Sequence, residues 1–256
     1  MAKKQVSAST NRKVPILKGH KADAPLRGSK ATANSTPKLS PKRLARATEI
    51  LDALREAYPD AHCELDYSTP QELLIATILS AQATDVGVNK ATPGLFAAFP
   101  TPQDYAKATP ADIEPCIRTI GLYRNKARAV HEAMKAVVER FDGQVPRTME
   151  ELLTLRGVAR KTANVVLGNA FGINIGFVVD THVERLSKRL GLAPLESSVA
   201  VVEKYLMAQF PQDSWCDVSH MLIFHGRRAC KARMAGCCGH LICENFGATC
   251  ELRESE

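Results

Sequence analysis

Repeated helix-start signals are the feature that most limits what this chain can fold into. Three segments read Thr-Pro-x-acid, at residues 69–72, 101–104 and 109–112, and residues 148–151 repeat the pattern without proline. Threonine is a good N-cap, proline fits the first helical position, and an acid near the N-terminus interacts favourably with the helix dipole. A helix is therefore predicted after each of the four threonines.

Apolar periodicity predicts helices along the rest of the chain from about Pro41. Spacings of three and four place Ala127, Val130, Met134 and Val137 on one face of a helix over 123–141. Further helices are expected over 84–98, 158–171, 180–190, 197–209 and 214–228, and Val178-Val179 is too short for a convincing strand. We therefore predict an all-α fold, in one or two domains for 256 residues.

The positive charge of the chain comes from its N-terminal tail. Residues 1–43 carry a net charge of +10, so the net +7 of the whole chain leaves −3 for the remainder. Residues 1–40 lack helical periodicity and are predicted to be disordered. Contact with nucleic acid and a merely solvated tail are both consistent with this composition.

Neither a membrane span nor a secretory signal is expected, because apolar runs are short and the basic N-terminus has no apolar core. An organellar address stays an alternative. Eight cysteines are present, and Cys230, Cys237, Cys238, Cys243 and Cys250 crowd into 21 residues. In a chain without a secretory signal, such a cluster indicates a metal site, either an iron–sulfur cluster or structural zinc.

Residues 154–182 combine a possible phosphate site with two reactive side chains. A turn around Gly157 leads into a helix whose first turn carries Arg160 and Lys161, and an apolar run ends at Asp180. Backbone N–H groups at a helix start bind phosphate, a free amine is a nucleophile, and a carboxylate manages protons and cations. The plain alternatives are a helix connection without a ligand, a solvated lysine, and an aspartate that caps the next helix.

Four motifs resemble the endonuclease III family of DNA glycosylases, and the resemblance covers nearly everything after residue 44. The motifs are LSAQATD at 79–85, TIGLY at 119–123, the segment from Lys161 to VDTHV at 179–183, and HGR at 225–227. The resemblance implies a nucleophilic Lys161 and a catalytic Asp180. It also implies a bifunctional glycosylase and β-eliminating AP lyase that acts on oxidised pyrimidines in duplex DNA.

The resemblance further implies residues that contact DNA. Gln82 would fill the space left by a flipped nucleotide, and Ile120 and Leu122 would wedge against the opposite strand. Core packing is the alternative for the two apolar residues. Asp85 matches a polar position near the lesion pocket, and its alternative role is the N-cap of the helix over 84–98. His182 follows the catalytic Asp180 and would orient the site, with a structural histidine as the alternative. The hairpin residues Gly157, Ala159 and Arg160 complete the predicted DNA contacts.

The cysteine spacing departs from the family pattern, Cys-x6-Cys-x2-Cys-x5-Cys. By resemblance the cofactor is a [4Fe–4S] cluster, with Cys230, Cys237, Cys243 and Cys250 as predicted ligands. Cys238 competes with Cys237, His240 is an alternative ligand, and an altered or absent cluster stays open.

The hairpin departs from the family's Pro-Gly-Val-Gly, because it reads Arg156-Gly157-Val158-Ala159. If position 159 requires a positive φ, alanine there costs about 1–2 kcal/mol and Ala159→Gly would raise stability or DNA affinity.

The resemblance implies two helical lobes with the active site in the cleft between them. Residues 63–173 would form a six-helix lobe, and residues 41–62 with 174–256 the iron–sulfur lobe. The expected partner is damaged or abasic duplex DNA, bound by a monomer in the bacterial cytoplasm, or in the nucleus or mitochondrion of a eukaryote. A monofunctional adenine or mismatch glycosylase and an inactive DNA-binding module are the alternatives; the former generally lacks the hairpin lysine.

Overall fold

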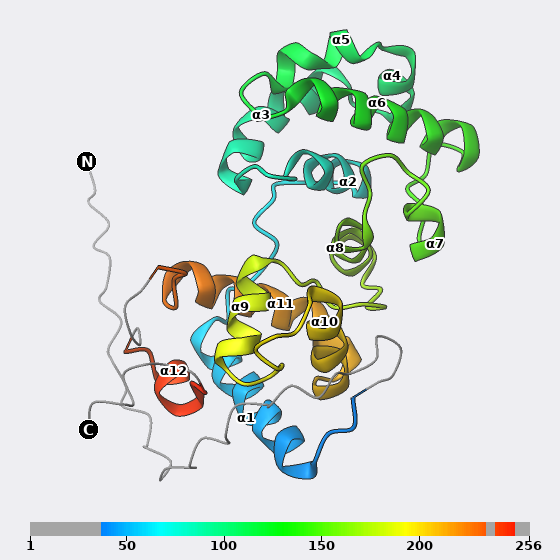
Figure 1. The fold of residues 1–256 in the computed structure, drawn as a ribbon. Helices are drawn as coiled ribbons and strands as arrows, with labels where there is room; N and C mark the ends of the chain where they lie inside the picture. Colours follow the sequence, from blue (N-terminus) through cyan, green and yellow to red (C-terminus); the bar gives the residue numbers. More distant parts are fainter. Residues whose placement is uncertain (1–36, 234–238, 249–256) are drawn as a thin grey trace, which may run out of the picture.

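The protein is all-helical throughout the part of the chain that the computed structural model describes, residues 37–233 and 239–248. This confirms the predicted all-α fold (Figure 1). The helices are α1 (Pro41–Ala57), α2 (Pro70–Leu79), α3 (Asp85–Ala98), α4 (Pro102–Lys107), α5 (Pro110–Ile113), the 3-10 helix η1 (Glu114–Ile117), α6 (Tyr123–Arg140), α7 (Met149–Leu152), α8 (Arg160–Phe171), α9 (Thr181–Arg189), α10 (Val199–Gln209), η2 (Gln212–Ser214), α11 (Trp215–Arg228) and α12 (Leu241–Phe246).

The predicted helix-start signals are used as N-caps. The hydroxyl of Thr69 accepts a hydrogen bond from the Glu72 N–H at 3.2 Å, and Thr101 forms a capping box with Asp104. Thr148 accepts from the Glu151 N–H at the start of α7, and at the start of α5 the Asp112 carboxylate accepts from the Thr109 N–H. Each cap satisfies backbone N–H groups that have no partner inside the helix, so the sequence signal acts locally.

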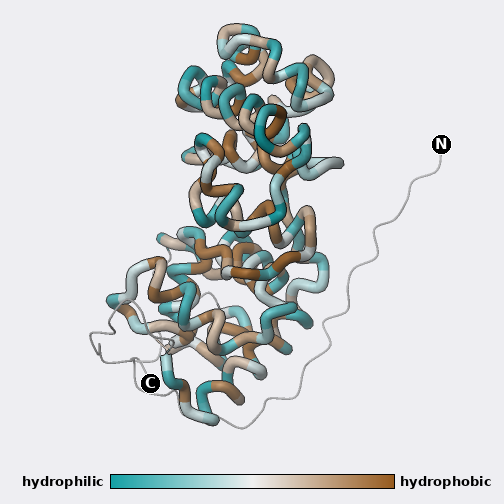
Figure 2. Tube along the Cα trace, turned by 90° about the vertical axis from the view of Figure 1, so that its right-hand side faces the viewer, coloured by the Kyte–Doolittle hydropathy of each residue, from teal (hydrophilic) through white to brown (hydrophobic). Residues whose placement is uncertain are grey.

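The buried side chains form two hydrophobic cores. The first, which we call the hairpin lobe, is built from α2 to α8 and includes Leu74, Val130 and Leu167. The second, the cysteine lobe, joins α1 to α9–α12 and includes Leu54 and Leu222. Figure 2 shows an elongated molecule in which the two groups of helices are stacked along the long axis, with hydrophobic positions between the helices of each. The predicted borders at 62/63 and 173/174 stay predictions.

The hairpin lobe is crossed by one long helix. α6 packs against α2, α4 and α5, and its buried stripe of Ala127, Val130, Met134 and Val137 follows the predicted spacing. α8 packs on α2 and α7 and lies between the two groups of helices in Figure 1. The start of α8 is therefore held where the lobes meet.

Two sequence predictions fall outside the part of the chain that the structure describes. They are the disorder of the tail, apart from residues 37–40, and the ligand roles of Cys237, Cys238 and Cys250. Among the described helices, none is both long and apolar enough to cross a membrane.

Candidate functional site

The turn before α8 requires glycine at position 157. Gly157 has a φ of +80°, and a Cβ there would lie 3.2 Å from Ala129 Cβ and 3.3 Å from Ile78 Cγ2. Both α6 and α2 therefore approach this backbone closely. Any larger side chain would be strained by its backbone conformation and crowded by its neighbours.

Ala159 does not strain the hairpin, which corrects the expectation of a positive φ there. Its φ is −99° and its ψ 171°, an extended conformation that alanine adopts freely. Ala159 is the N-cap of α8 and has no side chain able to cap it. The first N–H groups of α8 are thus left for another acceptor, such as a phosphate.

Substitutions at these two positions should destabilise the protein to different extents. Gly157→Ala is expected to lower the free energy of unfolding by at least about 1–2 kcal/mol, because of its positive φ and its close neighbours. Ala159→Gly is the matched control and should cost no more than about 1 kcal/mol, through backbone entropy alone. Urea denaturation measures both; a larger loss for Ala159→Gly than for Gly157→Ala would contradict this assignment of strain.

Asp180 begins α9 and is placed by the backbone of that helix. Its Oδ1 accepts hydrogen bonds from the N–H groups of His182 and Val183, both at 2.8 Å. The residues before it, Phe177, Val178 and Val179, are buried, whereas Asp180 is only partly covered. The predicted N-cap is present, and it leaves the carboxylate facing a cavity.

Lys161 and Asp180 line the same cavity of about 670 Å³. Lys161 is exposed in the first turn of α8, in the hairpin lobe, while Asp180 belongs to α9 of the cysteine lobe. The cavity therefore lies where the two lobes meet. It is lined by Ser80, Ala83, Thr84, Asp85, Val86, Lys161, Val179, Asp180, Thr181, His182, Glu184, Val199 and Arg227.

Asp85 and His182 also line this cavity. Burial raises the pKa of the Asp85 carboxyl, while the nearby charges of Lys161 and His182 act to lower it. Thr84, not Asp85, is the N-cap of α3, so the carboxylate of Asp85 is not used as the cap. It accepts a hydrogen bond from Arg227 Nη2 at 2.6 Å, and Arg227 also pairs with Glu64.

Two loop residues predicted to enter DNA are exposed and have an unusual backbone. Gln82 has a φ of +55° and Leu122 a φ of +60°, and Leu122 is 59% exposed. A positive φ is uncommon for residues other than glycine and clusters at functional sites. Both side chains are therefore exposed to solvent on turns. The surrounding fold must stabilise the unusual backbone of these turns.

Ile120 is not available as a wedge, which corrects that prediction. Only 4% of its surface is exposed, and it belongs to the core of the hairpin lobe. The turn at Gly121 separates it from Leu122, so the two apolar residues face opposite environments. Core packing, the alternative for this position, is the observed arrangement.

Arg160 is engaged within the protein. Its Nε and Nη2 donate to Glu203 of α10 at 2.9–3.1 Å. The guanidinium charge is thus balanced by a carboxylate of the cysteine lobe, and the predicted phosphate contact would have to compete with this pair.

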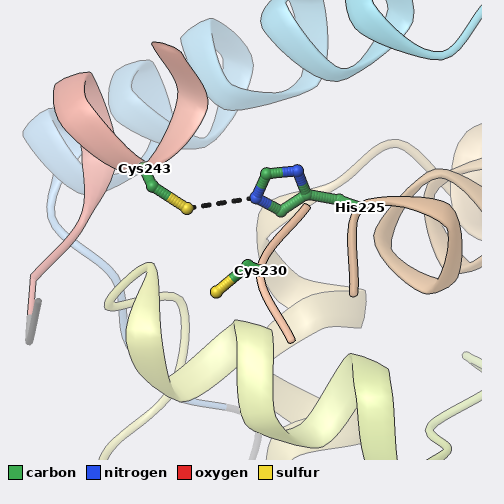
Figure 3. A group of neighbouring side chains, drawn as sticks. All are labelled: His225, Cys230 and Cys243. Carbon is green, nitrogen blue, oxygen red and sulfur yellow. Dashed lines mark hydrogen bonds between the residues drawn. The ribbon is translucent and has the colours of Figure 1, made fainter. Parts of the chain in front are cut away.

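A cysteine–histidine group in the cysteine lobe can hold a metal. The ligand atoms of His225, Cys230 and Cys243 all lie within 4.8 Å of one another, and the three side chains converge in Figure 3. His225 Nε2 lies 3.1 Å from Cys243 Sγ, and Nδ1 is hydrogen-bonded to the Tyr58 hydroxyl at 2.7 Å. Burial lowers the pKa of His225 to about 4, so the imidazole is neutral.

Cys230 has the chemistry of a metal ligand. Hydrogen bonding with Cys243 and with the Arg189 guanidinium, 3.0 Å from Sγ, lowers the pKa of Cys230 to about 5. The thiolate is therefore the form present at neutral pH, and thiolates bind iron–sulfur clusters and zinc. These residues fit a cysteine-ligated metal group.

The pattern of HhH-GPD superfamily base excision DNA repair proteins matches residues 75–212. Endonuclease III of Synechocystis sp. is 53% identical over 192 residues, which are 75% of this chain and 87% of that protein. The chain belongs to the endonuclease III family. Endonuclease III of Escherichia coli K12 is 43% identical over 82% of this chain and 97% of the relative.

Members of the endonuclease III family have also been solved with DNA. In the structure of a trapped endonuclease III–DNA covalent intermediate, the protein chain is 44% identical to this one. The two superpose with a TM-score of 0.75, and the match covers 84% of this chain and 97% of that chain. A non-covalent endonuclease III–DNA complex has a TM-score of 0.76 at 44% identity. The family match over residues 75–212 includes both Lys161 and Asp180.

The roles of two residues, His225 and Glu203, were not predicted from the sequence. His225 was recognised only as part of a motif, although it lies five residues before Cys230 at the end of a predicted helix and so within reach of the thiols. Glu203 carried no signal at all, because its partner Arg160 is 43 residues away in the sequence.

Proposed function

We propose that this endonuclease III family protein is a bifunctional DNA glycosylase and AP lyase that removes oxidised pyrimidines from duplex DNA in base excision repair. The observation that carries the proposal is the meeting of Lys161 and Asp180 in one cavity between the lobes. An amine nucleophile forms a Schiff base, which a monofunctional glycosylase does not need. Asp180 supplies the carboxylate that such chemistry requires.

Lys161 acts as the nucleophile in this mechanism. Its unprotonated Nζ attacks C1′ of the damaged nucleotide, and the base leaves with the electrons of the glycosidic bond and a proton. Opening of the sugar ring gives a Schiff base, which acidifies C2′. Loss of the C2′ proton expels the 3′ phosphate, and water then releases the sugar remnant from the lysine.

Asp180 stabilises the cationic sugar and moves protons. Because its Oδ1 is held by two backbone N–H groups of α9, the carboxylate cannot turn away from the cavity without breaking the N-cap. The α8 N-terminus places its uncapped N–H groups beside Lys161, where a DNA phosphate would be held.

Gln82 and Leu122 give access to the base in this proposal. A base must leave the stack to reach Lys161, and the gap must be filled. The Gln82 amide can hydrogen-bond to the unpaired partner base, while the exposed Leu122 separates neighbouring bases. Ile120 supports the loop from the core and does not enter DNA.

Alanine substitutions at Leu122 and Ile120 test whether Leu122 contacts DNA while Ile120 packs in the core. Leu122→Ala should weaken binding to lesion-containing duplex and leave the free energy of unfolding within about 0.5 kcal/mol of wild type. Ile120→Ala should cost about 2–5 kcal/mol of unfolding free energy, because it removes a buried side chain. Fluorescence anisotropy and urea denaturation separate the effects; unfolding caused by Leu122→Ala would refute the wedge role.

The proposed cofactor is a [4Fe–4S] cluster, with Cys230 and Cys243 as ligands together with Cys237 and Cys250. The cluster would stabilise the segment that carries its cysteine ligands, because this segment is too short to form a hydrophobic core of its own. Wild type should contain iron and acid-labile sulfide, and Cys243→Ser should lose both along with thermal stability. Cys116→Ser, in the hairpin lobe, is the control and should keep the cluster. Stoichiometric zinc without sulfide would overturn this assignment.

The proposed partner is duplex DNA with a damaged base or an abasic site, bound by a monomer. Because the relatives come from bacteria, we place this action in the cytoplasm, at the nucleoid. A panel of duplexes tests the substrate class. Release of base from a thymine glycol duplex, faster than from duplexes with mismatched adenine, supports the proposal; the reverse order favours the adenine or mismatch glycosylase.

A further inference from the structure

Besides the pair between Arg227 and Asp85, a second ion pair joins the two lobes next to the nucleophile. Arg160 precedes Lys161 in the first turn of α8, and its guanidinium makes three hydrogen bonds of 2.9–3.1 Å to the carboxylate of Glu203. α8 packs in the hairpin lobe, whereas α10 packs through Val202 and Leu206 in the cysteine lobe. The contact therefore crosses the lobe boundary one residue from the reacting amine.

Glu203 is also tied to the next turn of α8. Only 8% of its surface is exposed, and its Oε1 accepts a hydrogen bond from Asn164 Nδ2 at 3.3 Å. Asn164 is itself buried and lies one turn after Arg160. A buried carboxylate that accepts hydrogen bonds from two residues on one face of a helix fixes the rotation of that helix about its axis and its position along the axis.

The backbone of the cysteine lobe leaves room for this contact. A Cβ at Gly176 would lie 2.5 Å from Asn164 Nδ2 and 2.7 Å from Glu203 Oε1. The absence of a side chain at position 176 is therefore a condition for the bond between Asn164 and Glu203. Gly176 lies four residues before Asp180, on the segment that carries the second catalytic group.

We propose that Glu203 is a positioning residue for the reaction: by holding Arg160 and Asn164, it fixes the start of α8 relative to the lobe that carries Asp180. Lys161 and Asp180 reach the same cavity from different lobes, so their separation depends on how the lobes are joined. The inference rests on the proposed function, in which both residues act on one sugar. A misplacement of about 1 Å between reacting groups can cost on the order of 100-fold in rate.

The same hairpin offers a matched control. Arg156 Nη1 donates to both oxygens of Glu132, at 2.8 and 3.0 Å, and both residues belong to the hairpin lobe. This pair also joins an arginine to a carboxylate near the same turn, although Glu132 is more exposed than Glu203, and it does not cross the lobe boundary. A loss of rate that requires the link between lobes should therefore appear in Glu203→Ala and be absent in Glu132→Ala.

The experiment measures the single-turnover rate of borohydride trapping on abasic-site DNA at saturating enzyme, together with affinity for a duplex bearing a tetrahydrofuran abasic analogue. Glu203→Ala should lower the trapping rate by on the order of 100-fold and keep affinity near wild type. Glu203→Gln should restore part of the rate, since its amide oxygen still accepts a hydrogen bond. Gly176→Ala should lower the rate with every charge intact.

Equal trapping rates for Glu203→Ala and Glu132→Ala would overturn the inference, as would a rate loss in Glu203→Ala that appears only below saturating enzyme. Arg160→Ala should lower the saturated rate by no more than Glu203→Ala, which also loses the Asn164 contact, and the double variant should add little to Glu203→Ala, because both contacts are already lost there. Additive losses in the double variant would also overturn it. Failure of the wild type to trap would overturn the proposed function itself.

Discussion

Lys161→Ala is expected to give no borohydride-trapped complex with abasic-site DNA, whereas the wild type gives a stable covalent one. Borohydride reduces the Schiff base between Lys161 Nζ and the sugar, and Lys161 is the only lysine among the described residues that line the cavity. Cleavage of thymine glycol DNA by the variant should fall by at least on the order of 10³-fold, since the covalent route is lost. Denaturing gel electrophoresis after borohydride treatment measures the complex.

A surface lysine provides the control for this variant. Lys135 is exposed on α6 and forms an ion pair with Glu139 at 3.7 Å, so Lys135→Ala removes the same charge from the same lobe. It should trap as fast as the wild type. Circular dichroism should show both variants folded, because Lys161 is exposed. Undiminished trapping in Lys161→Ala would end the assignment of the nucleophile.

Asp180→Asn should separate the two roles of Asp180. The asparagine oxygen can still accept from the His182 and Val183 N–H groups, and asparagine caps helices about as well as aspartate. Thermal stability should therefore stay close to wild type. Without the carboxylate charge, turnover on thymine glycol DNA should fall by on the order of 10²–10⁴-fold. Thermal denaturation and single-turnover kinetics measure the two effects.

Asp180→Ala is the comparison that makes this result decisive. Alanine removes both the charge and the cap, so it should lose the same activity and also about 0.5–2 kcal/mol of stability. Full activity of Asp180→Asn would show that position 180 is only a helix cap. Equal destabilisation by both substitutions would show that the cap is held by something other than the Oδ1 hydrogen bonds.

The helices could be predicted because their signals are local. Thr69, Thr101 and Thr109 each cap a helix within three residues, and the apolar spacing of α6 specifies its buried face without knowledge of its partners. Asp180 was predicted as an N-cap for the same reason. Interactions that span a few residues can be deduced from one sequence, because both partners are visible in it.

Contacts between distant segments could not be predicted in this way. The burial of Ile120 depends on helices from the whole hairpin lobe, and the pairing of Arg160 depends on a helix 43 residues further on. Ala159 has an extended backbone, which the presence of glycine at this position in the family pattern did not indicate. His225 was missed because its role depends on the packing of α11 against Tyr58 and α12.

Incubation of the wild-type protein with a duplex carrying a single thymine glycol, without alkali, tests the central claim most directly. The bifunctional mechanism predicts release of the oxidised base together with a nicked strand that ends in an unsaturated sugar at its 3′ end. Base release that leaves the strand intact until alkali is added would contradict the lyase role of Lys161. Binding without base release would contradict catalysis altogether.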